Sequence, residues 1–396
     1  MKTIVRSTYL NKLIDLKNTP DIKIITGVRR SGKSELMKSF QNYLRENESN
    51  INIVYIDFND LNNEFLLEYH KLYDFIMAKY DSNKTNYLFI DEIQMCPNFE
   101  KTINSLHNKN IYDIYLTGSN AFLLSSDLAT LFTGRYMEVH VFPFSFNEFC
   151  SYYDIKDKNL AFDKYVVDGG LSGSYLYKNK NDRNQYIKDV YETIIKRDLV
   201  ERYNLGNRFL FDNISNFLMD NISNITTPNK ISGILVNNGI KTNHITISNY
   251  IKYLCDAFLF YEIRRYDITG KKYLATNSKY YVSDTGFRYS LLGTKNLNFG
   301  RAYENIVAIE LLRRGYKLFV GKLYSTEIDF VAMKGNEQIY IQVSSDIYNE
   351  DTFKREYEPL LKIRDAYPKV IIARTNQPKY TYEGIVIVDI VDWLLN

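Results

Sequence analysis

The sequence predicts a mixed α/β protein in which a parallel sheet comes first and further regions follow it, and three observations predict this order. A short apolar strand, Asp21–Thr26, runs directly into a glycine-rich loop and then into a helical pattern. A later apolar strand ends in two carboxylates, Asp91 and Glu92. From about Asn296 onward, helix and strand patterns alternate, which predicts a second α/β region.

The glycine-rich loop reads Gly27-Val-Arg-Arg-Ser-Gly-Lys-Ser34 and fills all the fixed positions of the phosphate-binding pattern G-x-x-x-x-G-K-S/T. Glycine lets the backbone curl so that successive N–H groups point into one concavity, and the following helix adds the positive end of its dipole. We expect Lys33 to reach the β- and γ-phosphates and the Ser34 hydroxyl to bind Mg²⁺. The predicted nucleotide-contacting residues are Gly27, Val28, Arg29, Arg30, Ser31, Gly32, Lys33, Ser34 and Glu35.

The second motif is Asn86–Gln94, where an apolar strand delivers Asp91 and Glu92 to the carboxyl edge of a parallel sheet. We expect Asp91 to bind Mg²⁺, usually through water, and Glu92 to act as the general base for an attacking water or to position it. Gln94 either senses the γ-phosphate or is a surface amide. Asp57, which ends an earlier strand, either orients magnesium-bound water or caps the next turn.

Two further residues complete the predicted chemistry. Asn120, with Ser119 beside it, follows the strand Ile111–Leu116 and is a candidate to contact the γ-phosphate or the attacking water, with turn formation as the alternative. Arg135 precedes the next strand, where an arginine finger would sit if subunits pack around the nucleotide, with an intramolecular salt bridge as the alternative. The predicted catalytic residues are Lys33, Glu92, Asn120 and Arg135, and the predicted metal ligands are Ser34 and Asp91.

Composition limits the class of protein. A chain of 396 residues is expected to form two or three domains. Its three cysteines are far apart and odd in number, which argues against a disulfide framework, and its four histidines show no metal-ligand spacing. Because no apolar run is long enough to span a bilayer and the first residues lack a signal-peptide core, we expect a soluble cytoplasmic protein. A modest basic surplus over residues 161–300 permits nucleic-acid contact without demanding it.

Short segments along the chain carry a resemblance to a known family. They are Gly27–Ser34, Asp91–Gln94, Leu116–Ser119, Gly134–Arg135, Pro143–Phe149, Asp168–Gly170, Ile195–Asp198, Lys279–Gly286, Glu304–Asn305, Glu327–Phe330, Ile341–Val343 and Arg355–Glu356. Together they resemble the prokaryotic AAA+ family of predicted ATPases that carry a C-terminal domain of unknown function. The resemblance covers essentially the whole chain and implies an ATP-hydrolysing module, a winged-helix segment and a restriction-endonuclease-like fold.

This resemblance and the helical patterns predict four domains. They are an AAA+-like P-loop ATPase core over residues 1–155, a helical lid over 156–204, a winged-helix-like domain over 205–292 and a nuclease-like α/β domain over 293–396. In the lid, Arg197 or Arg202 could approach the nucleotide, and a solvated or paired arginine is the alternative.

In the winged-helix-like domain we expect helices at Asn229–Leu235 and His244–Leu254, and a wing built from Tyr261–Tyr266 and Lys279–Val282. The third helix could enter a DNA major groove, but it holds few Arg or Lys residues, and packing against protein is the alternative. The groove candidates are Thr246, Asn249 and Lys252, and the basic wing residues are Arg264, Arg265, Lys271 and Lys272.

In the last domain Glu304, Asp329 and Gln342 match the layout of restriction-type nucleases, to which this region is similar. Where those enzymes carry E-x-K, this chain reads Gln342-Val-Ser344. Gln342 can coordinate a metal weakly through its carbonyl, whereas Ser344 cannot replace a lysine that orients water. We therefore expect a fold retained for packing or partner recognition, and not a working nuclease.

The sequence thus predicts a multidomain ATPase that binds ATP with Mg²⁺ and changes the presentation of its C-terminal domains on closure. One alternative is an ATP-gated DNA-binding or nuclease effector, as in mobile-element handling or phage defence. Another is a slow nucleotide-dependent switch that docks a protein partner, and a homo-oligomer is a further possibility. No N-K-x-D tetrad ends a core strand, which favours adenine over guanine.

Overall fold

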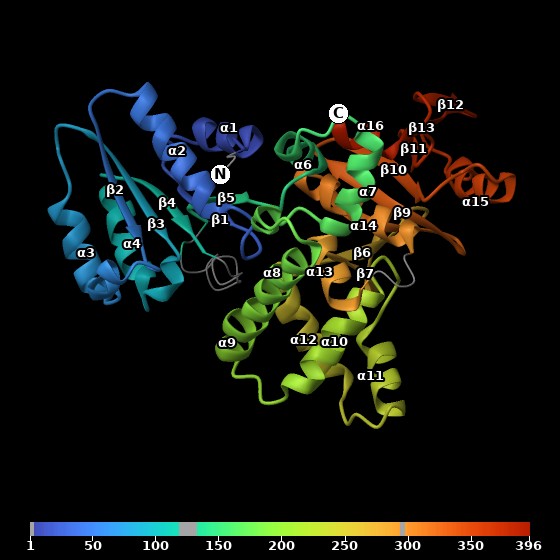
Figure 1. Cartoon of the computed structure of the whole chain (residues 1–396), viewed down its shortest axis with the longest axis horizontal. Coiled ribbons are helices and arrows are strands. Elements are labelled where there is room, and N and C mark those ends of the chain that lie inside the picture. Colours follow the sequence, from blue (N-terminus) through green and yellow to red (C-terminus); the bar gives the residue numbers. More distant parts are fainter. Residues whose placement is uncertain (1–3, 119–131, 133, 294–297) are drawn as a thin grey trace. The chain divides into compact units, whose positions relative to one another are not determined.

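The computed structural model describes residues 4–118, 132, 134–293 and 298–396 (Figure 1). The chain forms two compact units. Unit 1 comprises Met1–Val141 and the short segment Asp256–Phe258, and unit 2 comprises Phe142–Cys255 and Leu259–Asn396. The chain therefore leaves unit 1 at Val141, before the boundary expected at residue 155.

Unit 1 is built on a five-stranded sheet whose strands all run parallel, in the order β2-β3-β4-β1-β5. The strands are β1 Ile22–Thr26, β2 Ile51–Asp57, β3 Thr85–Asp91, β4 Asp113–Thr117 and β5 Tyr136–His140. This confirms the predicted parallel α/β sheet. In the register Asp57 pairs with Asp91, so β2 and β3 deliver a carboxyl group to the same edge of the sheet.

Helices cover both faces of this sheet because its central strands are apolar on both faces. The helices of unit 1 are α1 Ser7–Asp15, α2 Lys33–Asn47, α3 Tyr69–Ala78 and α4 Phe99–Lys109, with short 3₁₀ helices η1 at Leu61–Leu66 and η2 at Ile93–Met95. Every residue of β1 is buried, and its alternate residues enter different cores. Ile24 belongs to the core that includes α3 and α4, and Ile25 belongs to the core that includes α1 and α2.

Unit 2 begins with a helical region that follows the predicted helical pattern closely. Its helices are α6 Phe146–Tyr153, α7 Lys158–Asp168, η4 Ser172–Leu176, α8 Lys180–Thr193, the π-helical segment η5 Ile194–Val200, α9 Glu201–Tyr203, α10 Arg208–Asp220, α11 Pro228–Asn237 and α12 His244–Asp256. The first of them starts at a capping box, in which Ser145 and Glu148 each bond the other's backbone N–H.

The rest of unit 2 is an eight-stranded sheet in the order β12-β13-β11-β10-β9-β8-β6-β7, with helices packed on it. The strands are β6 Phe260–Asp267, β7 Lys272–Val282, β8 Lys317–Leu323, β9 Thr326–Lys334, β10 Glu337–Ser344, β11 Lys369–Ala373, β12 Tyr380–Tyr382 and β13 Ile385–Asp389. The helices are α13 Thr285–Leu292, α14 Phe299–Arg313, α15 Glu350–Leu361 and α16 Ile390–Leu395.

This sheet changes the interpretation of the expected wing. The hairpin β6–β7 does form, but β6 also pairs in parallel with β8. Strands on both sides of the boundary expected at residue 292 therefore share one sheet, and the structure does not separate a winged-helix domain from the nuclease-like region there. The reason is that the other edge of β6 is free to extend the sheet, which the sequence pattern of a hairpin cannot reveal.

In the described part of the chain, no helix combines the length and the apolar character that a membrane crossing needs.

Candidate functional site

The glycine-rich loop joins β1 to α2 at the carboxyl edge of the parallel sheet. Gly27 and Gly32 have φ angles of +138° and +96°, which side chains rarely permit. A Cβ atom on Gly27 would lie 2.1 Å from the carbonyl oxygen of Val141, so only glycine fits at this position. The loop therefore has the tight curl that the sequence predicts.

Lys33, the first residue of α2, folds back over its own loop. Its ammonium group donates to the carbonyl oxygens of Gly27 at 2.9 Å and Val28 at 3.1 Å, and the residue is only 5% exposed. Both of these acceptors are neutral, so each holds the ammonium less strongly than an anionic oxygen would. The loop therefore holds a buried cation through two carbonyl groups, and phosphate oxygens can replace these carbonyls as acceptors.

Asp91 ends β3 and is almost fully buried. The hydroxyl of Thr117, at the end of β4, donates to Asp91 Oδ1. Burial raises the pKa of Asp91, and the nearby Ser34 and Thr117 hydroxyls oppose that rise. The structure thus brings the end of the loop and the acid of β3 together. Hydroxyl and carboxyl oxygens are the ligands that Mg²⁺ prefers, so these two side chains fit a magnesium ion.

Glu92 follows Asp91 and has a positive φ of 56°, so the backbone leaves the extended conformation of β3 at this residue. Its backbone N–H donates to Thr117 Oγ1 at 3.1 Å, and Gln94 Nε2 donates to its Oε2 at 2.5 Å. Gln94 therefore contacts the predicted base directly. Asp57 accepts from the backbone N–H of Asn59 at 2.9 Å, which is the turn-capping alternative for this residue.

The other two predicted catalytic residues are Arg135 and Asn120. Arg135 Nη1 donates to Asn108 Oδ1 at 2.9 Å, a contact within the same unit and with an amide, not with an acid. Asn120 and Ser119 lie outside the described residues.

Two residues at this edge were not predicted from the sequence. The Thr117 hydroxyl donates to Asp91 and accepts from the backbone N–H of Glu92. Its position at the end of β4, the strand beside β3, is the feature of the sequence that could have identified it. Arg6 donates from Nη1 to the carbonyl oxygen of Ser31 inside the loop at 2.9 Å. No local pattern identifies Arg6, because it precedes the loop and lies outside every motif.

A second charged cluster lies in unit 2, around Lys279 of β7, which is 3% exposed. The ammonium nitrogen is 2.8 Å from Glu304 of α14, 2.8 Å from Glu327 and 3.2 Å from Asp329, both of β9. Burial opposes the charge of Lys279, but the three carboxylates outweigh it and raise its pKa. Burial raises the pKa of Glu304 to about 8, and Tyr281 donates to the same carboxyl group at 2.7 Å. The cation fills the space between the acids expected to hold a metal.

The amide of Gln342 is engaged at both ends in this cluster. Its Oε1 accepts from the backbone N–H of Asp329 at 2.7 Å, and its Nε2 donates to Glu356 Oε2 at 3.1 Å. Asp329 Oδ2 in turn accepts from the N–H of Val343 at 2.9 Å, and Ser344 donates to a backbone carbonyl. The carbonyl that was expected to coordinate a metal weakly is therefore bonded to the protein backbone, because β9 and β10 pair at this point. Among the described residues, no set of three or more His, Cys, Asp or Glu side chains has an arrangement that could hold a metal ion.

Two of the family-like segments meet each other at the start of unit 2. Asp284 Oδ2 accepts from the N–H of Gly170 at 2.5 Å, and its Oδ1 accepts from Gly286 at 2.8 Å. A Cβ atom on Gly169 would lie 1.9 Å from this carboxyl group, which explains the glycine there. Burial raises the pKa of Asp284 to about 7, and the backbone N–H donors oppose the rise. The segments therefore have a structural role in joining the α7–η4 turn to α13.

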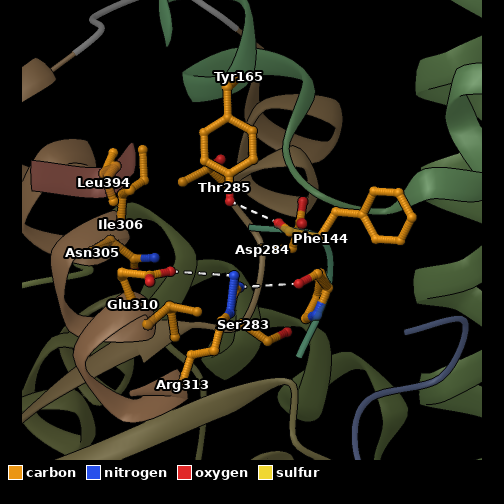
Figure 2. A pocket seen from close by; sticks show the side chains of 12 residues that line it. Phe144, Tyr165, Ser283, Asp284, Thr285, Asn305, Ile306, Glu310, Arg313 and Leu394 are labelled. Carbon is orange, nitrogen blue, oxygen red and sulfur yellow. Dashed lines mark hydrogen bonds and ion pairs between the residues drawn. The ribbon is translucent and has the colours of Figure 1, made fainter. Parts of the chain in front are cut away.

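Figure 2 shows the small cavity beside this junction, where Arg313 of α14 reaches toward the first residues of unit 2. Arg313 Nη2 donates to the carbonyl oxygen of Pro143 at 3.0 Å, and Nη1 lies 3.2 Å from Glu310. Tyr165 donates to the carbonyl oxygen of Phe144 at 2.9 Å. The cavity is about 20 Å³, which is room for about one water molecule.

The helical region shows weak signs of a nucleic-acid interface. On α12, Asn249 and Lys252 are exposed and Thr246 is half-buried. Arg264 lies 3.7 Å from Glu262, which offsets its charge. Arg197 is exposed within the π-helical segment η5, and π-helical geometry recurs at functional sites.

Comparison with known proteins defines the class of this chain. Residues 19–150, which include the loop and the acid pair, match a family described as "AAA domain", and this confirms the predicted AAA-type domain. Residues 159–298 match a family described as a domain of unknown function, DUF8612. The winged-helix and nuclease-like interpretations of the later regions stay predictions.

The chain is 38% identical over 398 residues to an uncharacterized protein of Haemophilus influenzae, covering 99% of this chain and 98% of that protein. It is 30% identical over 378 residues to an uncharacterized protein of Methanocaldococcus jannaschii, covering 90% of this chain and 82% of that protein. The chain therefore belongs to the family that these two proteins represent.

Among solved structures, the chain is similar to AMPPCP-bound DnaA from Aquifex aeolicus, at 14% identity and a TM-score of 0.31 over 63% of this chain and 86% of that one. It is similar to the replication initiator DnaA bound to AMPPCP and single-stranded DNA, at 14% identity and a TM-score of 0.33 over 62% and 86%.

Proposed function

We propose that this protein binds ATP with Mg²⁺ at the loop of unit 1 and hydrolyses it. The observation that carries the proposal is that the loop holds the buried ammonium of Lys33 on its own carbonyls, while Ser34, the next residue, lies near enough to Asp91 to oppose the rise in the pKa of that carboxyl group. A phosphate cradle, a cation and an acid pair are the parts that nucleoside triphosphate hydrolysis requires. The AAA-type domain match over the same residues supports this class of activity.

Phosphate binding follows from the loop and from Lys33. The curled backbone of Gly27–Glu35 offers N–H donors and the start of α2 offers a positive dipole end, both of which favour an anion. As the phosphates enter, Lys33 exchanges the carbonyls of Gly27 and Val28 for anionic oxygens, which are stronger acceptors. Ser34 and Asp91 would hold Mg²⁺, and the ion supplies positive charge that offsets charge on the phosphate oxygens.

Hydrolysis requires a base beside the γ-phosphate. Glu92 takes a proton from water as the water oxygen bonds to the γ-phosphorus, and the bond to the β,γ-bridging oxygen breaks to release ADP and phosphate. Gln94 and Thr117 support this role, because one bonds the Glu92 carboxyl group and the other bonds its backbone N–H. Asn120 and Arg135 complete the proposed set, as a contact to the γ-phosphate or water and as an arginine finger.

Hydrolysis drives a conformational change in the C-terminal regions through the chain that follows β5. The N–H of Val141 donates to the carbonyl oxygen of Thr26 at 2.8 Å, directly before the loop. Two residues later, Pro143 is held inside unit 2 by Arg313. A shift of the loop on nucleotide release therefore has a short covalent route into unit 2.

The second candidate function is a nucleotide-dependent switch that docks a protein, and exposed apolar side chains on α10–α12 favour it over DNA binding. Phe209, Val236 and Ile245 are 68%, 50% and 61% exposed. Exposed apolar groups are typical of protein contacts, whereas a DNA interface needs several cations.

The Lys279 cluster ties β7 to α14 and β9. This supports a structural role for the region, and not a nuclease activity.

ATP turnover by purified full-length protein tests the proposal, with and without duplex DNA. Wild type should hydrolyse ATP, and Lys33→Ala should lose ATP binding. Glu92→Gln should bind ATP, but its kcat should fall by about 100-fold or more. The exposed changes Lys109→Ala on α4 and Glu46→Gln on α2 are matched controls and should behave as wild type. Absence of turnover in wild type, or normal turnover by Glu92→Gln, would contradict it. DNA stimulation of wild type would favour the effector alternative.

A further inference from the structure

Arg6 lies outside the loop motif yet contacts the middle of the loop. It is 6% exposed, and its Nη1 donates to the carbonyl oxygen of Ser31 at 2.9 Å. The same nitrogen lies 3.8 Å from the point where a side chain on Gly32 would begin. A guanidinium group is thus packed against the part of the loop that leads into α2.

The position of Arg6 is fixed by the elements around it. Arg6 is the N-cap residue of α1, and its carbonyl oxygen accepts from the N–H groups of Tyr9 and Leu10. Its guanidinium carbon lies 4.5 Å from the centre of the Tyr9 ring, a cation–π contact. Tyr9 and Leu13 pack in the same core as the α2 residues Leu36, Met37 and Phe40. The helix that carries Arg6 and the helix that follows the loop are therefore held together.

Two cations hold the loop through its carbonyl groups. Lys33 holds the carbonyls of Gly27 and Val28, and Arg6 holds that of Ser31. A carbonyl and the N–H of the next residue belong to one planar peptide unit and point in opposite directions. Fixing the Ser31 carbonyl on Arg6 therefore fixes the opposite direction of the Gly32 N–H, one of the donors that a phosphate needs.

Resting on the proposed function, we propose that Arg6 is a positioning residue for phosphate binding, which keeps the loop in shape while Lys33 moves to the nucleotide. Lys33 cannot bond the phosphates and the Gly27 and Val28 carbonyls with the same N–H groups. When it leaves, the Ser31 carbonyl keeps its cation because Arg6 comes from α1 and not from the loop. The effect of Arg6 is therefore on affinity, and not on the chemical step.

The test compares Arg6→Met and Arg6→Lys with Lys12→Met. Lys12 lies on the same helix and also donates to a backbone carbonyl, that of Glu138 at 2.9 Å, but outside the loop. We expect Arg6→Met to raise the Kd and KM for ATP with Mg²⁺ by about tenfold and to leave kcat within about twofold, since one charged hydrogen bond is lost. Arg6→Lys should recover most of the affinity, and Lys12→Met should match wild type.

Amide hydrogen exchange in nucleotide-free protein separates this inference from the proposed function. Arg6→Met should speed exchange at Ser31–Lys33 and leave exchange in β3 and β4 unchanged, whether or not the wild type hydrolyses ATP. Equal Kd values for Arg6→Met and Lys12→Met, or a loss in kcat alone, would overturn the inference. So would an Arg6→Lys variant that folds but binds as weakly as Arg6→Met, because packing and not charge would then explain the contact.

Discussion

Lys33 in unit 1 and Lys279 in unit 2 are both almost fully buried, yet their surroundings differ in kind. Lys33 donates to two neutral backbone carbonyls of the loop, and Lys279 lies within 2.8–3.2 Å of three carboxylates. An ammonium group has three N–H donors, so three carboxylates can occupy all of them. Anionic phosphate oxygens are stronger acceptors than the two carbonyls of the first site, and the three acceptors around Lys279 are themselves carboxyl oxygens.

The difference teaches that a buried lysine among polar groups does not by itself indicate a catalytic site. What matters is whether an incoming ligand offers the cation a better partner than the protein does. By this measure a phosphate offers Lys33 better acceptors than the Gly27 and Val28 carbonyls, whereas Lys279 already lies against carboxyl groups. Variants that remove each lysine should therefore fail in different ways.

The largest effect is expected for Lys279→Met. Removing the cation leaves the Glu304 carboxyl group and the Glu327 and Asp329 carboxylates facing one another without it, so the free energy of unfolding should fall by about 3–5 kcal/mol. Urea unfolding at neutral pH measures this loss, with the exposed Lys362→Met as the matched control. Adding Glu304→Gln to Lys279→Met should restore part of the stability. A loss below about 1 kcal/mol would contradict the comparison.

Lys33→Met should show the opposite behaviour. We expect ATP affinity to weaken by about 100-fold, because two charged contacts to phosphate oxygens are lost, and the free energy of unfolding to change by less than about 1 kcal/mol. Calorimetric titration and urea unfolding of the same preparation measure both quantities. A variant that unfolds easily but still binds ATP would reverse the roles assigned to the two lysines.

Thr117→Val tests the acid pair with an isosteric change. Losing the hydroxyl removes partners from Asp91 and from the N–H of Glu92, so kcat should fall about tenfold while the Kd for ATP changes by no more than about threefold. Thr102→Val is the matched control, since that buried hydroxyl donates to the carbonyl of Tyr69 on α3, away from the loop. Equal rates for the two variants would remove Thr117 from the site.

The smallest effect is a pH dependence of stability. The pKa of Glu304 is raised to about 8 from an ordinary 4.5, so the folded state binds more protons than the unfolded state between these values. The free energy of unfolding should therefore fall as pH rises through this window, and Glu304→Gln should reduce the slope by up to about 1.4 kcal/mol per pH unit. Asp284 acts in the same direction, so the slope should decrease and not vanish. An unchanged slope between pH 5 and 8, measured by urea unfolding, would count against the raised pKa.

The sequence predicted those features that depend on residues close together in the chain. The loop, the strand that ends in Asp91 and Glu92, and the parallel sheet follow from short apolar runs and fixed motifs, and the structure brings Ser34 and Asp91 together as those motifs imply. The sequence could not predict contacts between residues that are far apart in the chain and belong to no common motif. Arg6 lies 25 positions from Ser31 and Lys279 lies 50 positions from Asp329, and only the folded chain brings each pair together.

The wing shows the same limit at a larger scale. The two strands of the hairpin were predictable from their alternation, but the pairing of β6 with β8 depends on which sheet edge is available after folding. The expected domain boundary at residue 292 rested on the resemblance and on helical patterns, neither of which shows strand pairing, and the sheet crosses it. The roles of Asn120 and Arg135 stay predictions, since one lies outside the described residues and the other contacts Asn108.

The most direct test of the central claim is an experimental structure of the protein with a non-hydrolysable ATP analogue and Mg²⁺. The account predicts that the phosphates lie in the loop, that Lys33 Nζ has left the carbonyls of Gly27 and Val28 for phosphate oxygens, and that Lys279 keeps its three carboxylates. An analogue bound elsewhere, or a bound loop in which Lys33 still holds both carbonyls, would contradict it.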